Sequence, residues 1–61
     1  MNSTEVIKKL KKAGFQKGRK GSNHDIYKHP DGRMTPVPRH KGKDIPIGTL
    51  RKIEKLSNVK L

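Results

Sequence analysis

The absence of cysteine from a chain of 61 residues constrains its fold more than any other feature. A domain of this size is close to the lower limit for folding without a disulfide or a structural metal ion, and neither a disulfide nor a cysteine-ligated zinc site is available to it. The fold must therefore depend on a short set of apolar residues, to which we assign Val6, Ile7, Leu10, Phe15, Ile26, Met34, Val37, Ile45, Ile47, Leu50, Ile53 and Leu56. That set suffices for helices packed on one small sheet, in a single domain over residues 1–61.

Two segments have the apolar spacing and the end signals of helices. The first begins at an N-cap provided by Ser3 or Thr4 and ends at Gly14, a residue type suited to the position after a helix. The second begins at an N-cap provided by Thr49 and ends near Ser57–Asn58. Both helices are basic and amphipathic, so each is expected to cover a core with one face.

The segment between the helices predicts three strands. A first strand starts at Phe15, and the polar, glycine-rich residues 17–21 predict the end of that strand and a turn. Residues 24–29 alternate between two faces of a second strand, and Pro30-Asp31-Gly32 is typical of a tight turn. Residues 33–38 form the returning strand, which Pro36 places at an edge because proline cannot donate to a central ladder. The sequence thus predicts an α+β domain of order α-β-β-β-α with an antiparallel sheet.

The charge of the chain restricts its partners. Sixteen Lys and Arg residues against five Asp and Glu residues give a net charge of +11. Such a charge favours phosphate backbones, anionic membranes or an acidic protein. No apolar run approaches the roughly 20 residues of a membrane-spanning helix, and the N-terminus lacks the apolar centre of a signal peptide, so we expect a cytoplasmic protein that does not insert into a membrane.

The three histidines, His24, His29 and His40, allow three interpretations. Their spacing matches no recognised set of metal ligands, so no metal site and no cofactor is expected. His29 precedes a proline at a turn and His40 enters a loop, positions typical of local hydrogen bonding or packing. His24 follows a glycine- and serine-containing turn at the start of a strand, and a histidine there could transfer protons near neutral pH.

An RNA substrate supplies its own nucleophile, the ribose 2′-hydroxyl. A nuclease without a metal ion then needs a proton-transfer group, cations that bind the phosphate, and in-line positioning of the reacting atoms. His24 could supply the first of these and the many Lys and Arg residues the second. Residue types alone leave open whether the histidine is catalytic or incidental.

The sequence resembles the HicA family of bacterial toxins, the mRNA interferases of HicA/HicB toxin–antitoxin pairs. The likeness covers nearly the whole chain and rests on an ordered set of short motifs: Ala13-Gly14-Phe15, Lys20-Gly21-Ser22 leading to His24, Ile26-Tyr27-Lys28-His29-Pro30-Asp31-Gly32-Arg33, Val37-Pro38, His40-Lys41-Gly42-Lys43-Asp44-Ile45 and Pro46-Ile47-Gly48-Thr49-Leu50. The resemblance implies a fold similar to double-stranded-RNA-binding domains. It also implies cleavage of mRNA, and neutralisation by a HicB-type antitoxin in a hetero-oligomeric complex.

The resemblance also implies roles for particular residues. The catalytic histidine of the family follows the glycine-rich turn, a position held here by His24, although Asn23 separates it from Ser22. Cations near this histidine would bind phosphate, and neighbouring polar groups would orient the ribose or the ring; the candidates are Arg19, Lys20, Ser22, Tyr27 and Lys28. Two other functions stay open at this stage, a non-catalytic RNA-binding module and a basic surface that binds an acidic protein.

Overall fold

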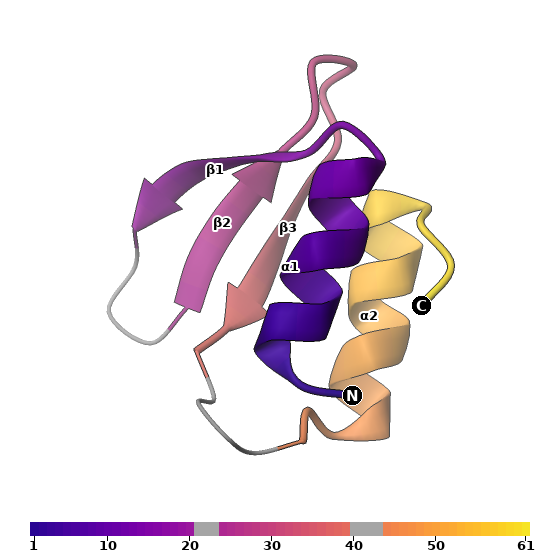
Figure 1. Cartoon of the computed structure of the whole chain (residues 1–61). Coiled ribbons are helices and arrows are strands. Elements are labelled where there is room, and N and C mark those ends of the chain that lie inside the picture. The colour runs from indigo at the N-terminus through magenta and orange to yellow at the C-terminus, as the bar shows by residue number, and fades with distance from the viewer. Residues whose placement is uncertain (21–23, 40–43) are drawn as a thin grey trace.

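The chain forms its elements in the order helix, strand, strand, strand, helix (Figure 1). Their bounds are α1 (Ser3–Lys12), β1 (Gln16–Lys20), β2 (His24–Lys28), β3 (Met34–Pro38) and α2 (Ile47–Ser57). This computed structural model describes residues 1–20, 24–39 and 44–61, with the backbone alone at Arg19 and Lys20. The predicted α-β-β-β-α order is confirmed.

The N-terminal helix α1 begins with a reciprocal cap formed by Asn2 and Glu5. The Asn2 Oδ1 accepts a hydrogen bond from the Glu5 backbone N–H at 2.9 Å, and the Glu5 carboxylate accepts one from the Asn2 N–H at 3.5 Å. Two of the amides left unpaired at a helix start are satisfied in this way. The prediction of Ser3 or Thr4 as the N-cap is therefore wrong, by one or two residues. Ser3 instead donates its hydroxyl hydrogen to the carbonyl of Pro38 in β3, which ties the helix start to the sheet.

The three strands form an antiparallel sheet of order β1-β2-β3, so β2 is central. In the β2–β3 pair His24 lies opposite Pro38 and Ile26 opposite Pro36, which places both prolines on the same face as the histidine. The edge position predicted for the strand of Pro36 is confirmed. The strand end predicted within residues 17–21 is confirmed, because β1 ends at Lys20 after a register shift between residues 17 and 19; Gly21 lies outside the described residues. β1 is an edge strand with a neighbouring strand on one side only, and charged side chains are common on such strands.

The turn between β2 and β3 has the predicted chemistry. The Gly32 N–H donates to the His29 carbonyl at 2.9 Å, with Pro30 in the first central position. Gly32 has a φ of +102°, which a residue with a side chain adopts only with strain. The hairpin closes as His29 donates its N–H to the Arg33 carbonyl at 2.8 Å.

The core lies between α1, the sheet and α2, and is smaller than the sequence predicted. Its fully buried apolar members are Val6, Leu10, Phe15, Tyr27, Val37, Ile45 and Ile53. Burying each large side chain of this kind stabilises the fold by about 1.5–3 kcal/mol. Tyr27 was not predicted to be a core residue, yet it is 3% exposed.

Three of the residues assigned to the core are exposed instead. Met34 is 48% exposed, Ile47 71% and Leu56 41%. Met34 belongs to the sheet face opposite the core, because it pairs with Lys28 on the same face as His24. That face of the sheet retains apolar side chains, and the groove described below runs along it.

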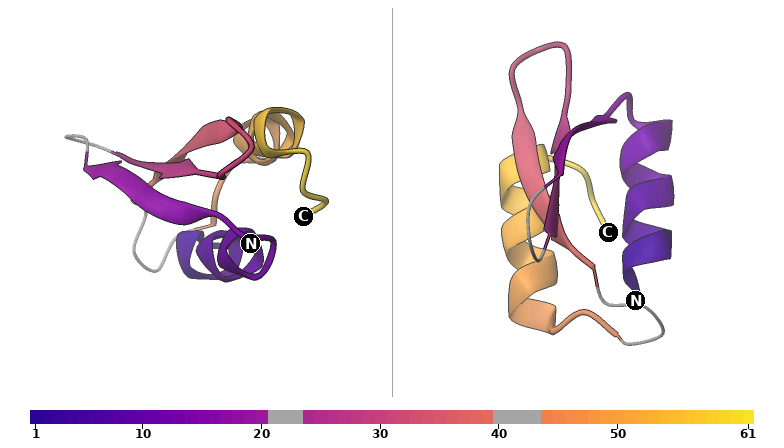
Figure 2. Two further views of the ribbon diagram at one scale, coloured as in Figure 1. Left: turned by 90° about the horizontal axis from the view of Figure 1, so that it is seen from above. Right: turned by 90° about the vertical axis from the view of Figure 1, so that its left-hand side faces the viewer.

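The two helices do not cover the same part of the sheet (Figure 2). Helix α1 lies across one face, whereas α2 runs beside β3 at the sheet edge, as both views show. The N-terminus is held against the segment before α2, since the Met1 carbonyl accepts a hydrogen bond from the Ile45 N–H at 2.8 Å and Asn2 bridges to Asp44. Neither helix of the described chain is long and apolar enough to cross a membrane.

Candidate active site

The alternation of β2 separates its residues into two groups with different surroundings. Asp25 and Tyr27 are buried on the side of α1, whereas His24 and Lys28 are exposed on the opposite side. This is the division that the sequence predicted for residues 24–28. His24 is the first residue of β2, and its side chain lines one cavity with Pro46 and Thr49 at the start of α2.

A groove of about 280 Å³ lies between this face of the sheet and α2. We call it the His24 groove; its lining includes His24, Pro36 and Pro38 from the sheet and Thr49, Lys52 and Leu56 from α2. Thr49, Lys52, Ile53 and Leu56 follow the i, i+3, i+4, i+7 spacing of one helix face. The docking of α2 beside β3 therefore brings the imidazole and the Lys52 side chain into one cavity.

A second groove of about 340 Å³ continues along the same face of the sheet. It shares Thr35, Pro36 and Leu56 with the His24 groove and adds Lys28 and Met34. The two together form a trough with apolar walls and basic side chains at its rim. None of the described residues that line it is an aspartate or a glutamate, so the trough favours anionic ligands.

The start of α2 adds to the positive character of the His24 groove. The N-cap is Pro46, which has no side chain able to cap the helix, and the first turn contains no acidic residue. Thr49, predicted as the N-cap, instead lies inside the first turn and lines the groove, so that prediction is wrong. The backbone amides at a helix start carry a partial positive charge, which an anion in the groove would meet.

The predicted site residues are distributed over both faces. Lys28 shares the face of His24 and lines the second groove. Tyr27 lies in the core on the other face, so the structure does not bring it beside the histidine. Burial and the nearby negative charge of Asp25 raise the pKa of the Tyr27 hydroxyl above its usual value of 10.0.

The remaining candidates are only partly within the described structure. The backbones of Arg19 and Lys20 lie in β1, opposite Ile26 and Asp25 respectively. Ser22 lies outside the described residues, and so does His40.

A buried carboxylate lies under the same end of the sheet, on the α1 side. Asp25 is 5% exposed as a residue, and its carboxylate oxygens lie 3.7 Å from the Lys17 Nζ and 3.8 Å from the Arg39 Nε. Two cations thus surround one buried anion, which keeps the region basic overall. Asp25 was not among the site residues predicted from the sequence, although an aspartate on the inward-facing side of a strand is unusual and requires such partners.

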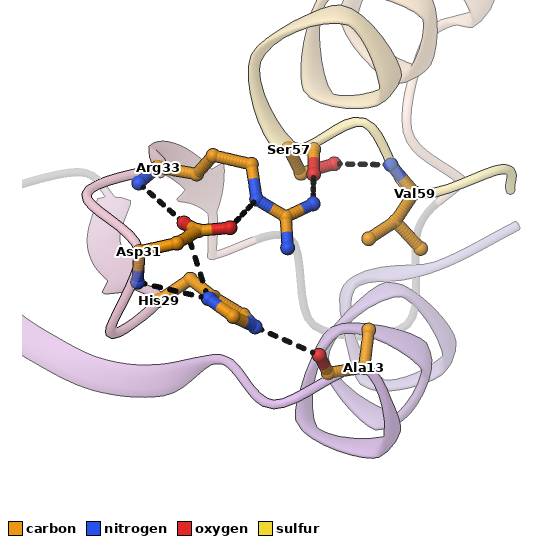
Figure 3. A network of polar contacts seen from close by, with 6 residues as sticks. All are labelled: Ala13, His29, Asp31, Arg33, Ser57 and Val59. Carbon is orange, nitrogen blue, oxygen red and sulfur yellow. Dashed lines mark hydrogen bonds and ion pairs between the residues drawn. The ribbon is translucent and has the colours of Figure 1, made fainter.

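His29, at the other end of β2, has an entirely structural set of contacts (Figure 3). Its Nδ1 lies 3.1 Å from both the backbone nitrogen and the Oδ1 of Asp31, and its Nε2 lies 3.1 Å from the Ala13 carbonyl oxygen. The ring also meets the Phe15 ring edge-on, with the centroids 5.1 Å apart. This histidine is therefore occupied in joining the β2–β3 turn to the end of α1.

Arg33 extends the same network to α2. Its Nε donates to the Asp31 carboxylate at 2.7 Å, and its Nη1 donates to the Ser57 carbonyl (Figure 3). Its guanidinium also lies 5.2 Å from the centroid of the Phe15 ring. The hydrogen bond from the Arg33 backbone N–H, followed by the contacts with the guanidinium and His29, lowers the pKa of Asp31 below its usual value of 3.8. Three separate segments of the chain meet at this network.

The fold and the trough together define a small, basic α+β domain that offers a histidine and lysines to an anionic ligand. The chain belongs to the HicA toxin family of bacterial toxin–antitoxin systems, because the model of that family matches residues 3–59 of the 61. The resemblance seen in the sequence is thus confirmed. A search of curated proteins returned no match. Members of the family are in general ribonuclease toxins, and a toxin of such a system has an antitoxin partner.

Proposed function

We propose that this protein is a metal-independent endoribonuclease that cleaves mRNA in the cytoplasm and so inhibits translation. The observation that carries the proposal is the position of His24, an exposed histidine in a groove lined by basic and apolar side chains. Within the described part of the chain the ring takes part in no hydrogen bond or ion pair that would occupy it. Membership of a family of ribonuclease toxins supports the same reading.

The reaction needs only groups that RNA and this groove provide. The ribose 2′-oxygen attacks the adjacent phosphorus, and the bond from phosphorus to the 5′-oxygen breaks. His24 accepts the proton of the 2′-hydroxyl or donates a proton to the departing 5′-oxygen, a contribution of typically 10²–10⁴-fold. Lysine side chains at the rim stabilise the negative charge that develops on the phosphate oxygens. The products are a 2′,3′-cyclic phosphate and a 5′-hydroxyl end.

The test compares the wild-type protein with His24→Ala, both freed of any antitoxin and assayed on RNA in the presence of a chelator. We expect scission by the wild type and a loss of at least about 10²-fold in the variant. RNA binding and thermal unfolding are measured on the same samples. Stability should be nearly unchanged because His24 is exposed, and RNA binding should be largely retained because lysine and arginine contacts with phosphate supply most of it. Fragments with 5′-hydroxyl ends accept a labelled phosphate directly from a polynucleotide kinase, whereas 5′-phosphate ends would contradict the mechanism.

The competing function is that of a non-catalytic RNA-binding module. It predicts binding that weakens steeply with salt, survives His24→Ala and leads to no scission by either protein. Equal binding without cleavage would therefore favour this alternative over a nuclease.

We propose further that the antitoxin is of the HicB type and covers the trough in a hetero-oligomeric complex. The basic rim of the trough suits an acidic partner, which would associate rapidly at low salt. Addition of a HicB-type protein should stop RNA cleavage and protect the amides of β2 and the start of α2 from hydrogen exchange. If the antitoxin inhibited cleavage but protected amides from hydrogen exchange only on the α1 face of the sheet, the proposed binding position over the trough would be contradicted.

A further inference from the structure

The His24 groove joins two chemically different surfaces that the sequence does not bring together. The imidazole comes from the first residue of β2, whereas Lys52 and Thr49 come from the middle and first turn of α2. Pro36, Pro38 and Leu56 line the same cavity and give it an apolar wall. A ligand that fills this space must offer an anionic group to the lysine and an apolar surface to the wall.

We propose that the His24 groove binds one unpaired nucleotide of the RNA substrate, with Lys52 as the phosphate-binding residue. This inference rests on the proposed ribonuclease function, which it extends by a binding residue on α2 and by a substrate class, single-stranded RNA. A nucleotide has the required combination of groups, because its phosphate is anionic and every base has an apolar face. The Thr49 hydroxyl is a second polar group on the same helix face, available to a phosphate or ribose oxygen.

The charge distribution leaves Lys52 available for such a ligand. The cationic side chains in the ion pairs of the described structure are Lys17, Arg33 and Arg39, together with His29 when it is protonated, and they contact Asp25 or Asp31. Glu54, the acidic residue of α2, contributes to a different cavity and accepts a hydrogen bond from the Leu61 N–H at 2.8 Å. No described residue of the His24 groove is acidic, so the ammonium group faces a space without a competing anion.

The size of the groove favours an unpaired nucleotide. At about 280 Å³ it is slightly smaller than the sites of about 300–1,000 Å³ that bind drug-sized molecules. A single nucleotide turned out of a strand can enter such a space, whereas a base that remains paired in an A-form duplex offers only its edge in a shallow minor groove. The second groove on the same face, which contains Lys28, is positioned to contact the neighbouring part of the strand.

The first experiment measures binding of adenosine 3′-monophosphate by two-dimensional NMR of ¹⁵N-labelled protein. We expect chemical-shift changes at the amides of Thr49, Lys52 and Leu56 and at the His24 ring. Lys52→Gln should weaken the binding by about tenfold, because it removes a charged hydrogen-bond donor, and Lys52→Arg should restore most of it. The matched control is Lys55→Gln on the same helix, an exposed lysine outside the His24 groove, which should leave the affinity unchanged.

The second experiment tests the substrate class by competition. A single-stranded oligoribonucleotide should displace the bound mononucleotide, whereas a blunt duplex of the same sequence should displace it at least tenfold less effectively. Equal effects of Lys52→Gln and Lys55→Gln, or shift changes confined to the α1 face, would overturn the assignment of the groove. Equal competition by the duplex would overturn the single-stranded class.

These outcomes can be told apart from a failure of the nuclease proposal. If the wild type cleaves RNA through His24 but the mononucleotide avoids the groove, the inference falls and the ribonuclease remains. If no RNA is cleaved but the mononucleotide binds through Lys52, the nuclease proposal falls and the groove remains a nucleotide site. If the protein cleaves RNA through His24 and also binds the nucleotide through Lys52, the kinetics of Lys52→Gln show how the lysine acts. A KM raised by about tenfold means that it binds the phosphate of the ground state, whereas a lower kcat means that it acts mainly on the transition state.

Discussion

The two ends of β2 carry the same residue type in opposite roles. His24, at the start of the strand, is exposed and lines a groove, whereas His29, just past its end, has both ring nitrogens engaged and one ring edge against Phe15. The difference arises from what surrounds each end. The His24 end faces the space between the sheet and α2, and the His29 end meets the last turn of α1. A histidine that is fully hydrogen-bonded stabilises a fold, while one without such contacts is available to a ligand.

The largest expected difference between the two histidines is in stability. His29→Ala removes the hydrogen bond to the Ala13 carbonyl and the ring contact with Phe15, and we expect a loss of about 1–3 kcal/mol. At about 4–8 °C per kcal/mol for a small domain, the melting temperature should fall by at least about 4 °C in a circular-dichroism melt. His24→Ala is the matched variant and should change the free energy of unfolding by less than about 0.5 kcal/mol. A similar loss in both variants would remove the distinction between them.

A pair of glycines tests how closely the His29 end is packed. Gly14 and Gly32 have nearly the same positive φ, +103° and +102°, but a Cβ atom at Gly14 would lie 2.8 Å from the His29 Nε2, whereas one at Gly32 would meet nothing within 4 Å. Both alanine variants suffer the same backbone strain, of about 1–3 kcal/mol. Gly14→Ala should be more destabilising than Gly32→Ala by about 1 kcal/mol in urea unfolding, because it displaces the imidazole. Equal losses of stability in the two variants would mean that the His29 ring moves aside at no cost in free energy.

The smallest expected effect is the response of the His29 network to acid. The pKa of Asp31 is lowered in the folded protein, chiefly by the hydrogen bond from the Arg33 N–H, so its stabilising contribution is present above about pH 3.8 and is lost as the pH falls through the folded-state value. The stability difference between the wild type and Asp31→Asn should therefore shrink from pH 6 to pH 3. Asp44→Asn is the control, because the Asp44 side chain is 88% exposed. A difference that grew on acidification would reverse the sign expected for this carboxylate.

Much of the fold follows from local sequence signals, and the site follows only in part. The turn at Pro30-Asp31-Gly32 and the alternation of β2 depend on neighbouring residues alone, so they were predictable, and with them the face on which His24 lies. The position of α2 beside β3 depends on contacts between distant segments. That position decides that Lys52 lies in the groove with His24, which no local pattern indicated.

The errors in the predicted core also arise because burial depends on contacts between distant segments of the chain. Met34 and Leu56 are apolar residues at regular positions in their elements, and they would be buried if a helix covered both faces of the sheet. Helix α1 covers only one face, so the outer face retains them as the walls of the trough. Tyr27 shows the converse, since it was a candidate for orienting the ribose or the histidine ring, yet its own ring contributes to the small core.

The two prolines of β3 also govern how this chain behaves among copies of itself. Pro36 and Pro38 face the same side of the sheet at alternate positions, and neither has an N–H group that an incoming strand could use. The other edge of the sheet, β1, carries a register irregularity and a run of cationic residues, both of which discourage strand addition. Both edges of the sheet therefore disfavour the addition of a strand from a second molecule. Contacts between copies of the chain would then depend on side chains, such as the apolar ones of the trough, and not on strand pairing.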